Sequence, residues 1–356
     1  MRILYLMGVD WHWIWQRPQI LAEKLSGDHE VRVVWGKEVF QKQALQTDRP
    51  EPKRGAAFAW LPYRDKSRVI FHLQRRLVRR AMGDLKQYDL IWIGHPLLYR
   101  YIDKKYHGRI VYDCMDNHMA LCPDERIRRQ IQLTESELTQ RADLIFASSL
   151  GLQQKLEKKG GAGKTVLIRN GFLNQGLHTP EKRESHKKEY HIGYFGTISE
   201  WFDFQKLMKS LEEFPQLSYH LFGPVSGTEI PDHPRLIHHG VVAHERLWDA
   251  IKEMDALAMP FVLNDLIRDV DPVKLYEYVS MGKPVISIYY EEIRQFSPFV
   301  SFYTTQTEYL EAVRSLMRQE NCSYDAEQQQ TFLKSSTWEE RYRMIQKNLA
   351  LFEKEK

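Results

Sequence analysis

Residues 269–277 carry the side chains of an anion-binding site at the start of a predicted helix. Asp271 is a good helix N-cap, and Pro272 suits the first helical position because proline lacks the N–H that would stay unbonded there. Lys274 in the first turn and Glu277 three residues later project from the same face. A helix N-terminus attracts phosphate through its free N–H groups, and Lys274 adds positive charge. Glu277 lies one turn deeper and suits sugar hydroxyls, so the segment predicts a nucleotide or nucleotide-sugar site.

A second group of reactive side chains follows the strand-like run 110–112. Two carboxylates, Asp113 and Asp116, and the imidazole of His118 form an acid–base group at a strand end. Asp116 lies further out along the loop and is the expected catalytic base. His118 is the alternative base and a candidate for positioning the acceptor. The competing interpretation gives Asp116 a capping role in a turn and Asp113 an interior hydrogen-bonding role.

The loop after the first strand holds three tryptophans and a histidine within residues 11–15. Aromatic faces in a cleft suit sugars and other flat rings. We therefore expect His12, Trp13, Trp15 and Arg17 to contact an acceptor, with Arg17 at the cap of the following helix and pointing towards the cleft. The alternative is that the tryptophans pack a domain interface.

Three strand-like runs in the second half each end at a glycine, at Gly196, Gly223 and Gly240. A glycine directly after a strand lets a ligand approach backbone N–H groups. The chain contains neither GxGxxG nor GxxxxGK[ST], which argues against dinucleotide binding and against P-loop ATP binding.

Asp269 and Asp271 formally make a DxD pattern, which in other proteins holds a divalent cation with a nucleotide diphosphate. Asp271 is better used here as a helix cap, and Lys274 already supplies positive charge. We therefore expect no metal site and no cofactor.

Short apolar runs alternate with helical stretches in two successive series, which predicts parallel sheets covered by helices on both faces. The first series has expected strands at 3–7, 31–35, 90–93, 110–112 and 144–147, and expected helices at 17–25, 69–85 and 127–141. The second series has expected strands at 192–195, 219–222, 236–238, 256–259 and 285–288. The chain is therefore expected to be an α/β protein with two doubly wound domains.

The expected domains are residues 1–175 and 190–335, with a linker near 173–190 and a last segment, 336–356, that is mostly helical and capped by Thr337. A length of 356 residues suits two domains, and 43% hydrophobic residues are ample for packed cores. The N-terminal apolar run is too short for a signal peptide, and no apolar run reaches the length of a membrane span.

Three cysteines, Cys114, Cys122 and Cys322, match no common zinc spacing and suit a reducing compartment. We therefore expect a cytoplasmic protein with buried or inert thiols.

Positive charge is concentrated in the first half, where residues 1–175 hold 30 Lys and Arg against 19 Asp and Glu. Within it, residues 64–86 combine a basic face with an apolar stripe, a pattern typical of helices that lie on anionic membranes. We expect peripheral membrane contact there, on the cytoplasmic face, and no nucleic-acid partner. The alternative is an ordinary surface helix whose stripe lies in the core.

Residues 272–278, PVKLYEY, followed by GKPV at 282–285, resemble a motif of glycosyltransferases with the GT-B fold. These nucleotide-sugar transferases carry an E-x7-E pattern. The sequence WQRPQ at 15–19 and the aspartates within 112–116 are similar to teichuronic acid biosynthesis glycosyltransferases of the TuaH type. The resemblance implies two Rossmann-like domains that face an interdomain cleft, with the final helix crossing back to the N-terminal domain.

The resemblance implies a donor site formed by Arg169, Gly196, Thr197, Val241, Val242, Asp269, Val273, Lys274 and Glu277. Glu277 matches the glutamate that binds the nucleotide ribose, and Val273 and Lys274 match the segment that meets the diphosphate. Asp269 takes the place of the first glutamate, near the transferred sugar. Many relatives carry an Arg and a Lys soon after the glycine at 196. Neither follows it here, so Lys274 and Arg169 are the expected substitutes.

The hypothesis that results is metal-independent transfer of a sugar from a nucleotide-sugar, expected to be a UDP-sugar, to a cell-envelope glycan or lipid-linked acceptor. Asp116 is the base if the reaction inverts, and it orients the acceptor if the reaction retains. Two alternatives stay open: a UDP-sugar epimerase on the same fold, and a non-catalytic scaffold that binds nucleotide-sugars.

Overall fold

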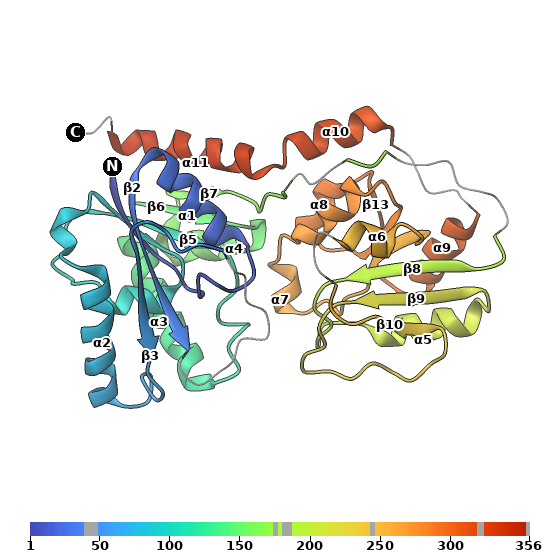
Figure 1. Ribbon diagram of the computed structural model, residues 1–356, viewed down its shortest axis with the longest axis horizontal. Coiled ribbons are helices and arrows are strands. Elements are labelled where there is room, and N and C mark those ends of the chain that lie inside the picture. Colours follow the sequence, from blue (N-terminus) through green and yellow to red (C-terminus); the bar gives the residue numbers. More distant parts are fainter. Residues whose placement is uncertain (39–48, 174–176, 180–186, 243–245, 319–323, 354–356) are drawn as a thin grey trace. The chain divides into compact units, whose positions relative to one another are not determined.

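The computed structural model consists of two compact units, each built on its own parallel sheet (Figure 1). Unit 1 comprises Met1–Arg169 and Arg341–Lys356, and unit 2 comprises Asn170–Glu340. The structure describes residues 1–38, 49–173, 177–179, 187–242, 246–318 and 324–353. Part of the expected linker and Cys322 lie outside the described residues. Both units have the α/β architecture that the alternating pattern predicts.

Unit 1 contains a seven-stranded sheet in the order β3-β2-β1-β4-β5-β6-β7. Its strands are β1 (Arg2–Leu6), β2 (Glu30–Glu38), β3 (Gly55–Trp60), β4 (Leu90–Ile93), β5 (Arg109–Cys114), β6 (Leu144–Ala147) and β7 (Thr165–Leu167). Leu6 at the end of β1 pairs with Val34 of β2 and with Ile93 of β4. The carboxyl ends of β1 and β4 therefore lie level, while β2 extends four residues further, and ligands bind at this edge in doubly wound folds.

Most helices of unit 1 begin at side chains that suit helix caps. The helices of this unit are α1 (Arg17–Asp28), α2 (Arg68–Met82), α3 (Glu125–Arg141), α4 (Leu150–Leu156) and most of α11 (Trp338–Glu353). The hydroxyl of Ser67 accepts a hydrogen bond from the Ile70 N–H at the start of α2. Thr337 accepts one from the Glu340 N–H at 3.3 Å, which confirms the expected cap of the last helix.

Unit 2 contains a six-stranded sheet in the order β10-β9-β8-β11-β12-β13. Its strands are β8 (Tyr190–Phe195), β9 (Leu217–Phe222), β10 (Leu236–His238), β11 (Ala256–Met259), β12 (Val285–Ile288) and β13 (Val300–Tyr303). Its helices are α5 (Phe204–Glu213), α6 (Leu247–Ile251), α7 (Asp265–Arg268), α8 (Val273–Ser280), α9 (Gln306–Met317) and α10 (Ala326–Lys334). In its core the buried Tyr219 hydroxyl lies within hydrogen-bond distance of Ser210 and Tyr309. This contact ties α5 and α9 to the sheet.

The ten strands expected in the two series are present and the strand-like run at 165–168 forms β7, but the pattern does not predict β3 or β13. Both are edge strands, with a neighbour on one side only. The β3 sequence GAAFAW is apolar but rich in glycine and alanine, which are depleted in strands, and Ser301 interrupts the apolar run of β13. Helix α2 also ends at Met82, three residues earlier than expected, because Gly83 with φ 74° stops it.

Cys114 and Cys122 are free thiols. Over the described ranges, the structure has no helix that is both long enough and apolar enough to cross a membrane.

A buried ion pair joins the start of α1 to the ends of β5 and β7 in unit 1. Arg17 donates from Nε and Nη2 to Asp113 at 3.0 and 2.7 Å, and from Nη1 to the Ile168 carbonyl at 2.7 Å. Arg17 is 3% exposed and Asp113 is 1% exposed. Arg17 stands at the first turn of α1 while Asp113 belongs to β5 and Ile168 follows β7, so the guanidinium fixes their relative positions.

Replacing Arg17 with methionine is expected to destabilise unit 1 by about 3–5 kcal/mol, because the Asp113 carboxylate would stay buried without its partner. Urea unfolding followed by circular dichroism measures the loss. The double variant R17M/D113N should recover most of it, and the exposed-site control R126M should stay within about 0.5 kcal/mol of the parent. An R17M protein as stable as the parent would contradict this role.

Candidate functional site

Three backbone turns pack on one another at the carboxyl ends of β8, β9 and β10. Gly196, Gly223 and Gly240 all have positive φ, at 130°, 144° and 73°. The Gly196 N–H donates to the Phe222 carbonyl at 2.8 Å, and the Gly223 N–H donates to the Gly240 carbonyl at 2.7 Å. A Cβ on Gly223 would lie 2.1 Å from the Gly196 oxygen. Only glycine fits the middle turn, and the three turns bring backbone without side chains together at these strand ends.

Helix α8 lies against the end of β8 through two side chains one turn apart. The side chain of Lys274 passes so close to Gly196 that a Cβ there would lie 1.9 Å from Lys274 Cε and 2.8 Å from Nζ. The Tyr278 hydroxyl accepts a hydrogen bond from the Phe195 N–H at 3.2 Å. Lys274 and Tyr278 share a helix face because they are four residues apart. The structure thus brings together Lys274 and Gly196, two of the expected donor-site residues.

The electrostatics around Lys274 suit an arriving anion. Burial lowers the pKa of Lys274, and the nearby Glu277 carboxylate acts against that shift. A buried ammonium group gains more from an opposite charge than an exposed one, since the surroundings screen the charge poorly. Glu277, at i+3 from Lys274 on α8, is only partly buried.

The start of α8 differs from the sequence expectation. Its N-cap is Pro272, which has no side-chain cap, and Asp271 is not the cap. The Asp271 carboxylate instead accepts from the Asn170 N–H at 2.7 Å, from the Tyr276 hydroxyl at 3.1 Å and from Gln295 at 3.2 Å. These donors come from three separate segments, and a carboxylate that is 2% exposed must find such partners inside the protein.

The contacts of Asp271 also affect whether the DxD pattern of Asp269 and Asp271 could hold a metal ion. Asp271 is already surrounded by hydrogen-bond donors, and Asp269 is 3% exposed and lies at the end of α7. Over the part of the chain that the structure describes, no group of three carboxylate, imidazole or thiol side chains is placed to hold a metal ion.

The other expected donor residues lie in different settings. The Thr197 carbonyl, next to Gly196, accepts from the Tyr194 hydroxyl at 2.7 Å. Val241 is 59% exposed just after Gly240, whereas Val242 packs partly against the core of unit 2. Val273 opens α8 and is partly buried. Arg169 is the last residue of the first segment of unit 1.

A cluster of titratable groups lies at the carboxyl end of β5 in unit 1. Burial raises the pKa of Asp116 to about 7; the Arg17 guanidinium opposes this shift and the Asp113 carboxylate adds to it. Burial lowers the pKa of His118 to about 4, so its imidazole is neutral near pH 7. The Nε2 atom of His118 is buried and has no hydrogen-bond partner among the described residues. Asp113 itself is the interior partner of Arg17, as the competing interpretation held.

His95 belongs to this cluster and was not among the candidates from the sequence. Its ring lies 4.3 Å from that of His118, centroid to centroid. The Leu97 N–H donates to His95 Nδ1 at 3.2 Å, so neutral His95 carries its proton on Nε2. Burial, followed by the neighbouring His118, lowers the pKa of His95. The position two residues after β4 was the available signal, because strand ends converge at this edge.

The aromatic loop after β1 is held largely by contacts within unit 1. Trp15 stacks under the Arg49 guanidinium at 3.9 Å and meets Trp11 edge to face at 5.5 Å. His12 Nε2 lies 3.1 Å from a Glu51 carboxylate oxygen. Trp13 is partly buried. These contacts leave the expected acceptor role of His12, Trp13 and Trp15 a prediction.

Arg17 differs from expectation, because its guanidinium is buried against Asp113 and does not face solvent. The N-cap of α1 is Gln16, not Arg17. An arginine followed by proline indicates a helix start. Only the fold shows that the buried Asp113 carboxylate lies beside the arginine.

Replacing Gly196 with alanine is expected to weaken UDP binding at least tenfold, because the added Cβ would displace the Lys274 side chain. Isothermal titration calorimetry with UDP measures the change. Gly227→Ala is the matched control: it also places alanine at a positive φ, 70°, in unit 2, but the nearest atom would be 3.4 Å from the new Cβ. Equal UDP affinity for both variants would rule out the Gly196–Lys274 contact as part of the site.

Comparisons with known proteins agree with this architecture. No protein-family model matches the chain. It is 26% identical over 197 residues to a Bacillus subtilis protein named as the teichuronic acid biosynthesis glycosyltransferase TuaH. That match spans 50% of this chain and about half the length of the curated relative.

Solved structures resemble the chain over nearly its whole length. The apo form of WaaB, a lipopolysaccharide outer core galactosyltransferase, is 13% identical with a TM-score of 0.70, covering 98% of this chain and 99% of its own. Anabaena HepE in complex with UDP-glucose is 16% identical with a TM-score of 0.68 and the same coverage. The chain therefore has the GT-B fold that its motifs predict, and it is similar to glycosyltransferases of that fold.

Proposed function

We propose that the protein is a glycosyltransferase that moves a sugar from a UDP-sugar to a cell-envelope glycan or lipid-linked acceptor. The observation that carries this proposal is the contact of Lys274 with Gly196, which sets a partly buried lysine side chain beside a glycine turn at the strand ends of unit 2. We keep the cytoplasmic location, which the low cysteine count favours, as part of the proposal.

The donor half of the proposal rests on charge and hydrogen-bonding capacity. Lys274 would stabilise the negative charge that develops on the leaving diphosphate, and no metal ion is part of this proposal. Glu277 would accept hydrogen bonds from the ribose hydroxyls, one turn further along α8. The UDP-glucose in the HepE structure supports a uridine donor.

The acceptor half rests on the cluster at the end of β5. A general base works best when its pKa lies near the working pH, and burial brings the pKa of Asp116 to about 7. In an inverting reaction Asp116 would take the proton of the attacking hydroxyl. The neutral imidazoles of His118 and His95 would position that hydroxyl. The names of the relatives, for teichuronic acid and for lipopolysaccharide outer core, support a cell-envelope acceptor.

Lys274→Ala is expected to lower kcat/KM for the UDP-sugar about 10²–10³-fold, because one preorganised positive group leaves the transition state. Glu277→Gln should act mainly on KM. The assay follows UDP release from UDP-glucose, UDP-galactose and UDP-N-acetylglucosamine, with cell-envelope glycan extracts as acceptors. Lys209→Ala, on the exposed side of α5, is the control and should match the parent.

The products of that assay separate the rival activities. Sugar joined to the acceptor supports transfer, whereas an epimer or free sugar released without any acceptor indicates a UDP-sugar epimerase. Binding of a UDP-sugar without turnover on any acceptor indicates a scaffold. A Lys274→Ala protein with the parent's rate would refute the proposed donor site.

The pH profile tests Asp116. As a base it acts when deprotonated, so kcat/KM should fall as the pH drops below about 7, and Asp116→Asn should lose transfer. The raised pKa also means that holding Asp116 charged destabilises the fold above pH 7, and that this cost shrinks as the pH falls. The gain in Tm from Asp116→Asn should therefore be larger at pH 8 than at pH 5. An equal gain at both pH values would contradict the raised pKa.

A further inference from the structure

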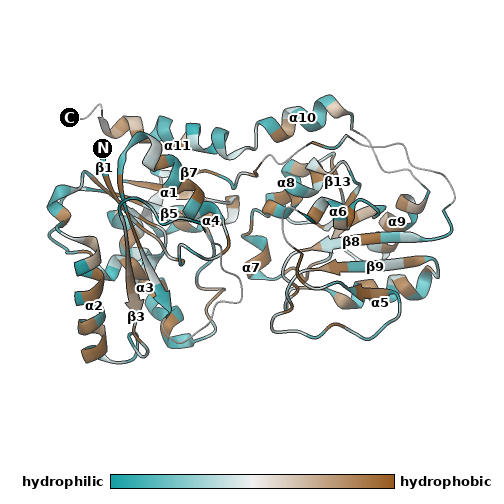
Figure 2. Ribbon diagram, viewed as in Figure 1, coloured by the Kyte–Doolittle hydropathy of each residue, from teal (hydrophilic) through white to brown (hydrophobic). Residues whose placement is uncertain are grey.

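The outer side of α2 leaves apolar side chains uncovered. Val69, Leu73 and Leu77 are 71%, 47% and 38% exposed, and their four-residue spacing sets them in one row along the helix. Tyr63, in the loop before α2, is 70% exposed. Among the described large hydrophobic residues, Tyr63 and Val69 are the two most exposed. Figure 2 shows hydrophobic and hydrophilic residues alternating along the turns of α2. We refer to these four side chains as the α2 outer face.

A row of positive charge runs beside the α2 outer face. Arg68, Arg76 and Arg80 are exposed and lie one residue before or three residues after members of the apolar row. Within the described ranges, none of these three arginines has an acidic partner. Arg79 differs, because it pairs with Asp103 at 3.3 Å. The fold therefore presents three guanidinium groups whose charge nothing in the described structure neutralises.

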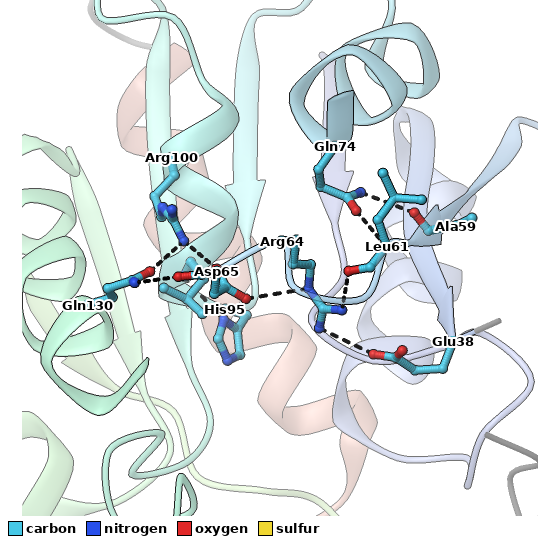
Figure 3. Close-up of polar contacts among 10 residues, drawn as sticks. Glu38, Ala59, Leu61, Arg64, Asp65, Gln74, His95, Arg100 and Gln130 are labelled. Atoms are coloured by element: carbon cyan, nitrogen blue, oxygen red, sulfur yellow. Dashed lines mark hydrogen bonds and ion pairs between the residues drawn. The ribbon is translucent and has the colours of Figure 1, made fainter. Parts of the chain in front are cut away.

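The loop that carries Tyr63 is held firmly to the rest of unit 1 (Figure 3). Asp65 binds Arg100 at 2.6 Å, and Gln130 of α3 bonds both to Arg100 at 2.8 Å and to the Asp65 carbonyl at 3.0 Å. Gln74 of α2 accepts from the backbone N–H at the start of the loop at 2.8 Å. These bonds tie the loop both to α2 and to α3.

Tyr63 has φ 61°, an unfavourable conformation for a bulky residue, so the surrounding contacts must impose it. A tyrosine that is held in this conformation and left exposed suits the boundary between lipid and water, where amphipathic aromatic rings prefer to lie.

We propose that the α2 outer face docks on an anionic lipid surface, with its apolar row entering the headgroup region and the three arginines binding acidic headgroups. Burial of apolar area and attraction between basic side chains and anionic lipids are the two contributions that bind a helix to such a surface. A second copy of this chain fits less well, because a symmetric pair would bring arginine rows of equal charge together. Docking does not depend on the proposed transfer reaction, because binding is measured without any sugar donor.

The test is flotation of the full chain with vesicles. Vesicles of phosphatidylcholine with 30 mol% phosphatidylglycerol should carry the protein at low salt, and pure phosphatidylcholine vesicles should not. Arg76→Gln with Arg80→Gln should weaken binding about 25-fold, since each arginine near a membrane contributes a factor of about five. Leu73→Ser with Leu77→Ser should weaken it at least tenfold. High salt should reduce binding, because salt screens the charges.

Two matched variants on exposed positions of unit 1 serve as controls. R126Q/R129Q removes two arginines from α3, and L121S/L133S removes two leucines that are 48% and 60% exposed. Both should bind vesicles as the parent does, and circular dichroism checks that every variant is folded. Losses as large in these controls would overturn the proposal, as would equal binding to pure phosphatidylcholine. Failure to float, combined with dimerisation that L73S/L77S abolishes in sedimentation velocity, would show that a second copy covers this face instead.

Discussion

The seating of α8 on the last residues of β8 is the contact on which the rest of the candidate donor site depends. Tyr278 bonds to the Phe195 backbone, and Lys274, one turn earlier, then necessarily lies over Gly196. A helix fixed at one residue presents its neighbours on the same face at fixed positions. The glycine at 196 follows from this geometry, because any side chain there would occupy the space of the lysine.

In unit 1, two neighbouring aspartates have different roles because their buried surroundings differ. Asp113 and Asp116 are three residues apart, yet Asp113 is bound by the Arg17 guanidinium while Asp116 lies beyond it with a pKa near 7. The histidines nearby are kept neutral by the same lack of solvent. The buried, titratable Asp116 thus lies at the proposed catalytic site. The adjacent Asp113 carboxylate is stabilised by its ion pair with Arg17.

The chain enters unit 2 beside α8, and this position explains why Asp271 bonds to Asn170 and does not cap the helix. The Asn170 N–H and side-chain amide bond to Asp271, so the first residue of unit 2 is tied to the segment just before the helix. Gly171 lies against the backbone of Trp338, where a Cβ would come within 2.7 Å. The two segments through which the chain passes between the units are therefore both fixed within unit 2.

The sequence by itself determined the two series of strands and helices and the fold class, because these rest on local periodicity. Lys274 and Gly196 were assigned to one donor site only by the resemblance to known glycosyltransferases. The sequence did not predict the edge strands β3 and β13, the role of His95, or the partners of Arg17 and Asp271. Each of those depends on contacts between residues far apart in the chain, such as 17 with 113 and 170 with 271. Only the tertiary structure decides which buried charge finds which donor, since burial and its energetic cost exist only once the chain has folded.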